Sequence, residues 1–248
     1  CCQNASTEQY KSSILICDAS RSGQTGCYEN RIISRLRAFR LSRIHVNFRS
    51  TREIGEAAQS YLSAGALDDE PIERHYRHSG PPPAMRAVRD SEEEADILRW
   101  FLPGAAHAFH LGIGACAVLC PSERAGRAIA SALEANGVHA RFMSGRDLDL
   151  SAQAVKVITL QSSKGLEFPI VALAGFTQSR RSGDLASDTD EETDERVEAS
   201  ARERRVLFVG MTRAMRALLV LTPARFGDKL FTGFDPAYWN LADQRERA

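Results

Sequence analysis

One segment of the sequence joins a predicted strand to a polar turn. The run Val155–Leu160 is aliphatic and β-branched, and it is followed by Gln161-Ser162-Ser163-Lys164-Gly165-Leu166-Glu167. The turn supplies hydroxyls, backbone N–H groups and a cation, and Gly165 allows a close backbone approach or a φ that other residues avoid. Glu167 can accept hydrogen bonds from hydroxyls such as those of a ribose. Since open α/β sheets bind ligands at the carboxyl ends of their strands, we expect a ligand site there. An ordinary strand–turn with incidental polar residues is the alternative.

Two arginines raise the question of an anionic ligand. Arg213 follows Thr212 in the stretch VLFVGMTRAMRALL, which we interpret as a largely apolar helix. Burying part of a guanidinium costs free energy unless it meets an anion, and its planar fork of donors suits phosphate oxygens. A carboxylate is the alternative partner. Arg49, behind Phe48, poses the same question, with a surface arginine after a strand as its alternative.

The elements that would position these residues alternate between strands and helices. Predicted strands are Ser13–Cys17, Ala115–Leu119, Val155–Leu160, Val171–Ala174 and Leu218–Thr222. Predicted helices are Arg31–Arg43, Thr51–Ala64, a helix from Ser91 and Glu123–Asn136. Thr51 or Ser50 is the expected cap of the second helix, and Ser91-Glu92-Glu93-Glu94 resembles a capping box. This alternation predicts an α/β fold with a parallel sheet flanked by helices.

Three polar segments interrupt that pattern. Residues 66–90 are rich in proline and polar residues, which indicates a connector. Residues 184–198 hold eight acidic residues and one basic residue, which predicts a solvated, disordered loop. The tail FDPAYWNLADQRERA is typical of a surface segment with one aromatic anchor.

Composition describes an ordinary soluble chain. It has 248 residues, 43% hydrophobic and 26% charged, with a formal net charge of +0, so nucleic-acid binding would depend on local patches. No apolar run approaches the roughly 20 residues of a membrane span, and no signal peptide is evident. Six cysteines in this length do not predict a disulfide scaffold, and we expect Cys116 and Cys120 to be core residues. We therefore expect a reducing, cytoplasmic location.

Three segments in fixed order resemble the UvrD/Rep/PcrA family of superfamily 1 helicases. NFRST, containing Arg49, resembles motif IV; VITLQSSKGLEF resembles motif V; ERRVLFVGMTRA, containing Arg213, resembles motif VI. The match covers roughly residues 45–60 and 115–222. The resemblance implies a RecA-like second motor domain whose edge completes an ATP site at an interdomain cleft.

The resemblance also implies roles for single residues. Arg49 and Arg213 would reach the γ-phosphate as arginine fingers, and Gly165 and Glu167 would lie near the sugar and phosphates of ATP with its Mg²⁺. Single-stranded DNA or a partial duplex would contact Thr159, Gln161, Ser163 and Lys164, with movement 3′ to 5′.

The sequence departs from the family pattern in three places. Gln161 stands where the family usually has His. Residues 14–28 match motif III only loosely, since Cys17 replaces a glycine and the nearest glutamine is Gln24. The distance from Thr51 to Val155 is short for a family that often inserts a helical subdomain there.

The motifs and the polar segments together predict a domain organisation. It comprises a poorly matched remnant (1–44), the first part of the RecA-like domain (45–65), a connector with a reduced insertion (66–114), the main part of the domain (115–222) and a C-terminal tail (223–248).

The phosphate- and metal-binding parts of an ATPase are not evident. Ser22–Gly26 lacks the Gly-Lys-Ser/Thr of a phosphate loop, and the acidic Asp190–Thr193 follows no apolar strand. We expect the lysine and the Mg²⁺ ligands to come from an N-terminal lobe, consistent with a fragment that opens on Cys1. The chain alone should then have negligible ATPase activity.

Two further hypotheses compete with the helicase interpretation. One is a truncated or degenerate, non-catalytic module that binds DNA or a partner. The other is a nuclease-fused relative, although no nuclease carboxylate cluster follows Thr222.

Overall fold

The computed structural model describes residues 46–47, 49–65, 75–179, 194–224 and 229–241. The predicted strand at 13–17 and the predicted helix at 31–43 lie outside these residues. The described elements from β1 onward belong to one compact unit that begins at Ile44.

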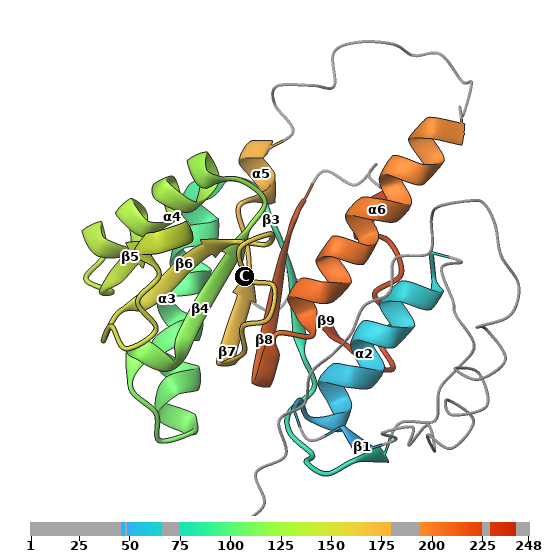
Figure 1. Cartoon of the computed structure of the whole chain (residues 1–248), viewed down its shortest axis with the longest axis horizontal. Helices are drawn as coiled ribbons and strands as arrows, with labels where there is room; N and C mark the ends of the chain where they lie inside the picture. Colours follow the sequence, from blue (N-terminus) through green and yellow to red (C-terminus); the bar gives the residue numbers. More distant parts are fainter. Residues whose placement is uncertain (1–45, 48, 66–74, 180–193, 225–228, 242–248) are drawn as a thin grey trace, which may run out of the picture. The chain divides into compact units, whose positions relative to one another are not determined.

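A seven-stranded sheet forms the centre of this unit, and every paired neighbour in it is parallel (Figure 1). Its spatial order is β5-β6-β4-β7-β8-β3-β9. The strands are β3 (Ala84–Val88), β4 (Cys116–Cys120), β5 (Ala140–Phe142), β6 (Val155–Thr159), β7 (Phe168–Leu173), β8 (Ala214–Pro223) and β9 (Asn240–Leu241). A separate parallel pair joins β1 (Val46–Asn47) to β2 (His75–Tyr76). The predicted parallel α/β sheet is confirmed.

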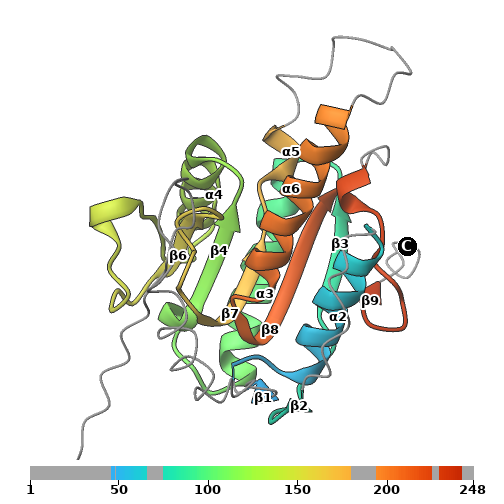
Figure 2. The same cartoon turned by 45° about the vertical axis from the view of Figure 1, so that its right-hand side comes forward.

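Helices cover both faces of the sheet, as the two views in Figures 1 and 2 show. α2 (Arg52–Ser63) and α6 (Asp194–Met211) pack on one face, and α3 (Ser91–Ala108) and α4 (Glu123–Ala135) pack on the other. A short α5 (Phe176–Ser179) follows β7, and single 3₁₀ turns are η1 (Ile113–Ala115), η2 (Gly145–Asp147) and η3 (Lys229–Phe231). None of the helices described is both long and apolar enough to cross a membrane.

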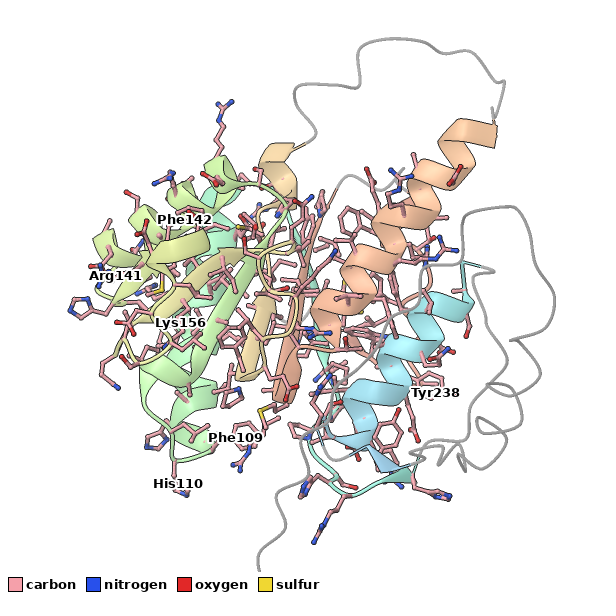
Figure 3. All side chains as sticks on the ribbon, in the orientation of Figure 1. Phe109, His110, Arg141, Phe142, Lys156 and Tyr238 are labelled. Atoms are coloured by element: carbon pink, nitrogen blue, oxygen red, sulfur yellow. The ribbon has the colours of Figure 1, made fainter. Side chains whose placement is uncertain are left out.

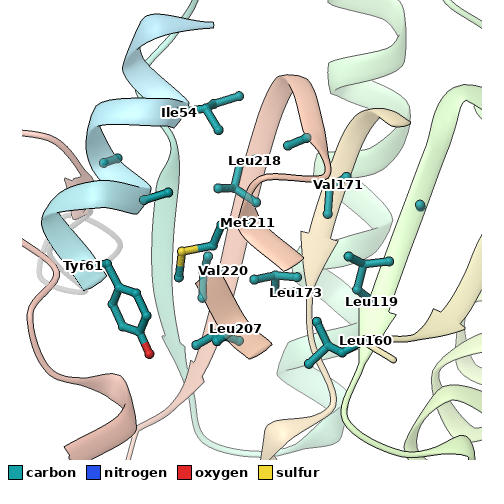
Figure 4. Close-up of a cluster of buried hydrophobic side chains, with 14 of the residues drawn as sticks. Ile54, Tyr61, Leu119, Leu160, Val171, Leu173, Leu207, Met211, Leu218 and Val220 are labelled. Carbon is teal, nitrogen blue, oxygen red and sulfur yellow. The ribbon is translucent and has the colours of Figure 1, made fainter. Parts of the chain in front are cut away.

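The core on the α2/α6 face joins motif-bearing helices to the central strands. Figure 4 shows Ile54 and Tyr61 of α2 and Leu207 and Met211 of α6 against residues of β7 and β8. All four side chains are at most 1% exposed. Burying such side chains stabilises a fold by about 1.5–3 kcal/mol each, so this layer holds the two helices in fixed positions on the sheet.

Helix boundaries follow local signals, with two corrections. Ser122 caps α4 as its hydroxyl accepts from Ala125 N at 3.3 Å, and Gly137, at φ +78°, follows its end. α3 is capped by Asp90, whose side chain accepts from two backbone N–H groups, so the capping box predicted from Ser91 is wrong. Thr51 occupies the N-cap position of α2 but makes no side-chain cap bond.

Longer-range pairing overturned several other predictions. The connector predicted over 66–90 is wrong for 84–88, which form β3 between β8 and β9. α3, at 91–108, packs on the sheet and is no separate subdomain. Residues 194–198, predicted as part of a disordered acidic loop, begin α6, and residues 184–193 lie outside the described residues. The helix predicted to run through Arg213 ends at Met211, and β8 begins at Ala214.

The tail carries the aromatic anchor that its sequence predicted. Trp239 is 2% exposed, and its indole N–H donates to the carbonyl of Ala57 on α2 at 3.2 Å. Its ring lies edge-on to Phe234, with centroids 4.8 Å apart, and Phe234 in turn contacts Tyr61. The following residues form β9, which pairs with β3.

Candidate functional site

Three segments far apart in the sequence meet at one edge of the sheet. Glu167 directly precedes β7, Arg213 directly precedes β8, and Arg49 precedes α2. The backbone N–H of Phe168 donates to the carbonyl of Arg213 at 3.0 Å, which aligns the starts of β7 and β8. The N–H of Thr51 donates to the carbonyl of Met215 at 3.2 Å, which fixes the start of α2 beside them. Arg49, Glu167 and Arg213 are thereby brought together into what we call the arginine cluster.

The arginine cluster lies at the amino ends of two strands. The polar turn starts at the carboxyl end of β6, but residues 160–167 lead back to the start of the parallel strand β7. The prediction of a site at the carboxyl edge is therefore wrong for Glu167. The rule about carboxyl edges describes loops that lead from a strand into a helix. Here a strand is followed by another strand without a helix between them.

Arg213 is held by backbone carbonyls. Its Nε donates to Val209 O at 3.0 Å and its Nη1 donates to Leu166 O at 3.3 Å. Burial lowers the pKa of Arg213, the nearby Arg49 lowers it further, and Glu167 acts in the opposite direction. An arginine stays protonated in proteins, so this balance means that an additional anion near the cluster would be favourable. The two carbonyls that orient the guanidinium left no signal in the sequence.

Arg49 and Glu167 form an ion pair through Arg49 Nε and Glu167 Oε1. Their side chains are 51% and 31% exposed, so the pair stands at the accessible rim of the cluster. The pair joins motif IV to motif V, and Glu167 gives Arg49 a carboxylate partner within the chain itself.

The turn before Glu167 is open at its glycine. Gly165 has φ +80°, a left-handed conformation that favours glycine, and a Cβ built there would find nothing within 4 Å. Gln161 and Lys164 are exposed on the same turn. The turn therefore presents an amide side chain, an ammonium group and bare backbone to the outside.

Two of the predicted DNA-contacting residues instead make bonds within the turn. Ser163 is 0% exposed and its hydroxyl donates to Leu160 O at 2.7 Å. The hydroxyl of Thr159 lies 2.9 Å from that of Ser162 and accepts from its N–H. Ser163 thus shapes the turn from inside, and its own side chain is not accessible to DNA.

Lys156, on the strand of the same motif, is also inward-facing. Its side chain is 2% exposed, and its Nζ donates to Gly114 O at 2.5 Å and to Ala152 O at 2.8 Å. Burial lowers the pKa of this lysine. Figure 3 labels it on β6. Because its ammonium group is buried and bonded to two carbonyls, it is not available to cradle a phosphate.

The described residues give no metal-binding group of three or more His, Cys, Asp or Glu side chains. A groove of about 1150 Å³ lies between β3 and α3, lined among others by Arg86, Ile97 and Trp100. It contains no residue of the arginine cluster. The cluster is instead an exposed edge with two guanidiniums and one carboxylate, suited to binding an anion that reaches it from outside.

The fold and this edge together define a RecA-like α/β lobe. A similar solved structure is the C-terminal domain of a possible DNA helicase from Lactobacillus plantarum WCFS1. The match covers 79% of this chain and 99% of that domain, with a TM-score of 0.56. The two sequences are 18% identical, so the likeness supports the fold alone. Residues 143–224 match the UvrD-like helicase C-terminal domain. The matched segment contains Glu167 and Arg213, and Arg49 lies outside it.

Two curated relatives are similar over part of the chain. DNA helicase II of Escherichia coli K12 is 36% identical over 81 residues, which are 32% of this chain and 10% of that protein. An ATP-dependent helicase/nuclease protein of Geobacillus thermodenitrificans is 32% identical over 113 residues, which are 35% of this chain and 9% of that protein. The chain thus matches about a tenth of the length of these relatives.

Proposed function

We propose that this chain is the C-terminal motor lobe of an ATP-dependent 3′–5′ DNA helicase. The observation that carries the proposal is the convergence of Arg49, Glu167 and Arg213 from three distant segments at one accessible edge. Two cations held near one another need anionic partners, and a triphosphate offers several.

The chain's residues fit a nucleotide in part. Arg49 and Arg213 would bind the terminal phosphates and, as arginine fingers, stabilise charge on the transferring phosphoryl group. Gly165 would let the backbone approach the nucleotide, and Glu167 would accept a bond from its sugar. A bound Mg²⁺ would neutralise part of the phosphate charge. With no carboxylate cluster among the described residues, we assign its ligands, and the phosphate-binding lysine, to an N-terminal lobe.

Single-stranded DNA would lie along the outer side of the motif V turn. Gln161 and Lys164 are exposed there, and Thr159 is half-buried at the end of β6. These groups suit contacts to a sugar–phosphate backbone that do not depend on base sequence. Ser163 would contribute by holding the turn rather than by touching DNA.

The proposal can be tested with the 248-residue chain. We expect the wild-type chain to bind a fluorescent ATP analogue weakly and to show no measurable ATP turnover. Arg213→Ala should bind the analogue roughly 10- to 100-fold more weakly, because charged hydrogen bonds to the phosphates are removed. Arg216→Ala removes the same charge from an exposed position on β8 and should bind like wild type. Equal loss in both variants, or DNA-stimulated turnover abolished by Arg213→Ala, would contradict the proposal in its present form.

A second measurement addresses DNA. The double variant Gln161→Ala/Lys164→Ala should bind a single-stranded oligonucleotide more weakly than wild type, with a smaller dependence of affinity on salt. A chain that binds neither ATP nor DNA would favour the non-catalytic, partner-binding module.

A further inference from the structure

The ion pair of Arg49 with Glu167 gives the arginine cluster a property beyond phosphate binding. Given that the cluster is the proposed nucleotide site, we propose that Glu167 is the counter-ion of Arg49 when no phosphate is bound and that a phosphate must displace it. Glu167 would thereby select nucleotides against phosphate compounds that lack a sugar.

The arginine cluster needs a counter-ion. Arg49 lies close enough to Arg213 to disfavour the charge of Arg213, and Glu167 is a carboxylate that offsets this repulsion. Neither guanidinium can release its proton, so the cluster cannot relieve the repulsion by neutralising itself. In the absence of a ligand, the carboxylate of Glu167 therefore takes the place that an anion would fill.

One edge of a guanidinium group binds one anion at a time. Glu167 Oε1 lies against Arg49 Nε, the same kind of donor that a phosphate oxygen would use. Arg213 differs, because its Nε and Nη1 are already committed to the carbonyls of Val209 and Leu166. A phosphate that binds through this edge of Arg49 thus has to exchange with Glu167, while Arg213 remains in position.

Once displaced from Arg49, the carboxylate of Glu167 needs a new partner. An inorganic polyphosphate breaks the ion pair and leaves Glu167 with water alone, beside a second anion. A nucleoside triphosphate also breaks the pair, but its ribose hydroxyls can donate to the freed oxygens. The open backbone at Gly165, two residues away, leaves room for the sugar. The exchange therefore disfavours bare phosphates more than nucleotides.

The exposure of the pair sets the expected size of the effect. Ion pairs between partly exposed side chains contribute weakly, so removing this one should tighten phosphate binding by about two- to fivefold. The effect should shrink at high salt, since exposed charges are screened.

The test compares inorganic triphosphate with ATP on the full 248-residue chain by isothermal titration calorimetry at low ionic strength. Glu167→Gln should bind inorganic triphosphate about two- to fivefold more tightly than wild type and ATP no more tightly, so that the preference for ATP falls. In an Arg49→Ala background, Glu167→Gln should give no such gain. Glu123→Gln is the matched control, since it removes a carboxylate paired with Arg127 on α4 and changes the net charge equally.

The outcomes separate this inference from the function on which it rests. If triphosphate binding is measurable but Glu167→Gln leaves it unchanged or weakens it, Glu167 is no competitor of phosphate and the inference is overturned. An equal gain in Glu123→Gln would assign the effect to net charge and overturn it as well. If wild type and Glu167→Gln bind neither probe, both the nucleotide site and the exchange are wrong.

Discussion

Glu94 is a buried acidic side chain, and burial disfavours its charged form. Replacing it with an uncharged side chain should therefore stabilise the protein at neutral pH. It lies in the first turn of α3, is 2% exposed, and its Oε1 accepts from the N–H of Gly175 at 2.7 Å. Its Oε2 is buried without a hydrogen-bond partner among the described residues. Burial raises the pKa of Glu94 from 4.5 to about 7, and the bond from Gly175 offsets only part of this.

Because the pKa of Glu94 is raised in the folded chain, the free energy of unfolding falls as the pH rises. Between pH 4.5 and 7 the carboxyl ionises in the unfolded chain but keeps its proton in the folded chain, so stability falls across this window and then levels off. Each tenfold change in proton affinity is worth about 1.4 kcal/mol, so the loss at pH 8 is roughly 3 kcal/mol. Glu94→Gln keeps the acceptor for Gly175 and removes the ionisation.

Urea unfolding at pH 4, 6 and 8 provides the assay. Glu94→Gln should be more stable than wild type by roughly 3 kcal/mol at pH 8, with the difference shrinking to within about 1 kcal/mol at pH 4. Glu92→Gln, an exposed residue of the same helical turn, should show no such pH-dependent gain. A difference between Glu94→Gln and wild type that does not change with pH would refute the reasoning.

Three further substitutions or probes test the packing around the motifs. Arg204 is 5% exposed, stacks 4.4 Å from the ring centroid of Tyr61 and donates to the carbonyl of Tyr61. Arg204→Ala should therefore lower the free energy of unfolding by about 2–4 kcal/mol. The control Arg205→Ala, at an exposed position, should change it by at most about 0.5 kcal/mol. Gly126→Ala places a Cβ 2.7 Å from the sulfur of Cys120 and should cost about 1–3 kcal/mol in the same measurement. Burial raises the pKa of the Cys120 thiol to about 12, so it should not react with a disulfide reagent at pH 8 until urea unfolds the chain.

Local signals made part of the fold predictable. β4, α4 and β6 were predicted to within a residue or two because an apolar run, a serine cap and a glycine stop are all encoded nearby in the chain. β3 was missed because it follows a proline run and contains Arg86. Its pairing with β8, more than 100 residues later, supplies the stabilisation that its own composition does not.

The end of α6 shows a different limit. The apolar stretch from Val206 to Val220 is nearly continuous, and periodicity cannot divide such a run between a buried helix and a buried strand. The tertiary structure divides it at Thr212 and Arg213, where the N–H of Phe168 binds the carbonyl of Arg213 and starts the β7–β8 ladder. The sequence indicated that Arg213 mattered but not that it stands at this junction.

Motif membership does not separate residues that make the site from residues that make the fold. Arg49, Glu167 and Arg213 meet through backbone hydrogen bonds of Phe168 and Thr51, so the side chains of Arg49 and Glu167 can change charge without loosening the strands that carry them. Arg213 differs, because its side chain also bonds the carbonyls of Val209 and Leu166. Other residues of the same motifs, such as the buried Ser163 and Arg204, hold turns and helices together. We therefore expect variants of Arg49 and Glu167 to lose binding without losing stability, and variants of Ser163 and Arg204 to lose stability. This is the pattern that a binding edge on a rigid sheet requires.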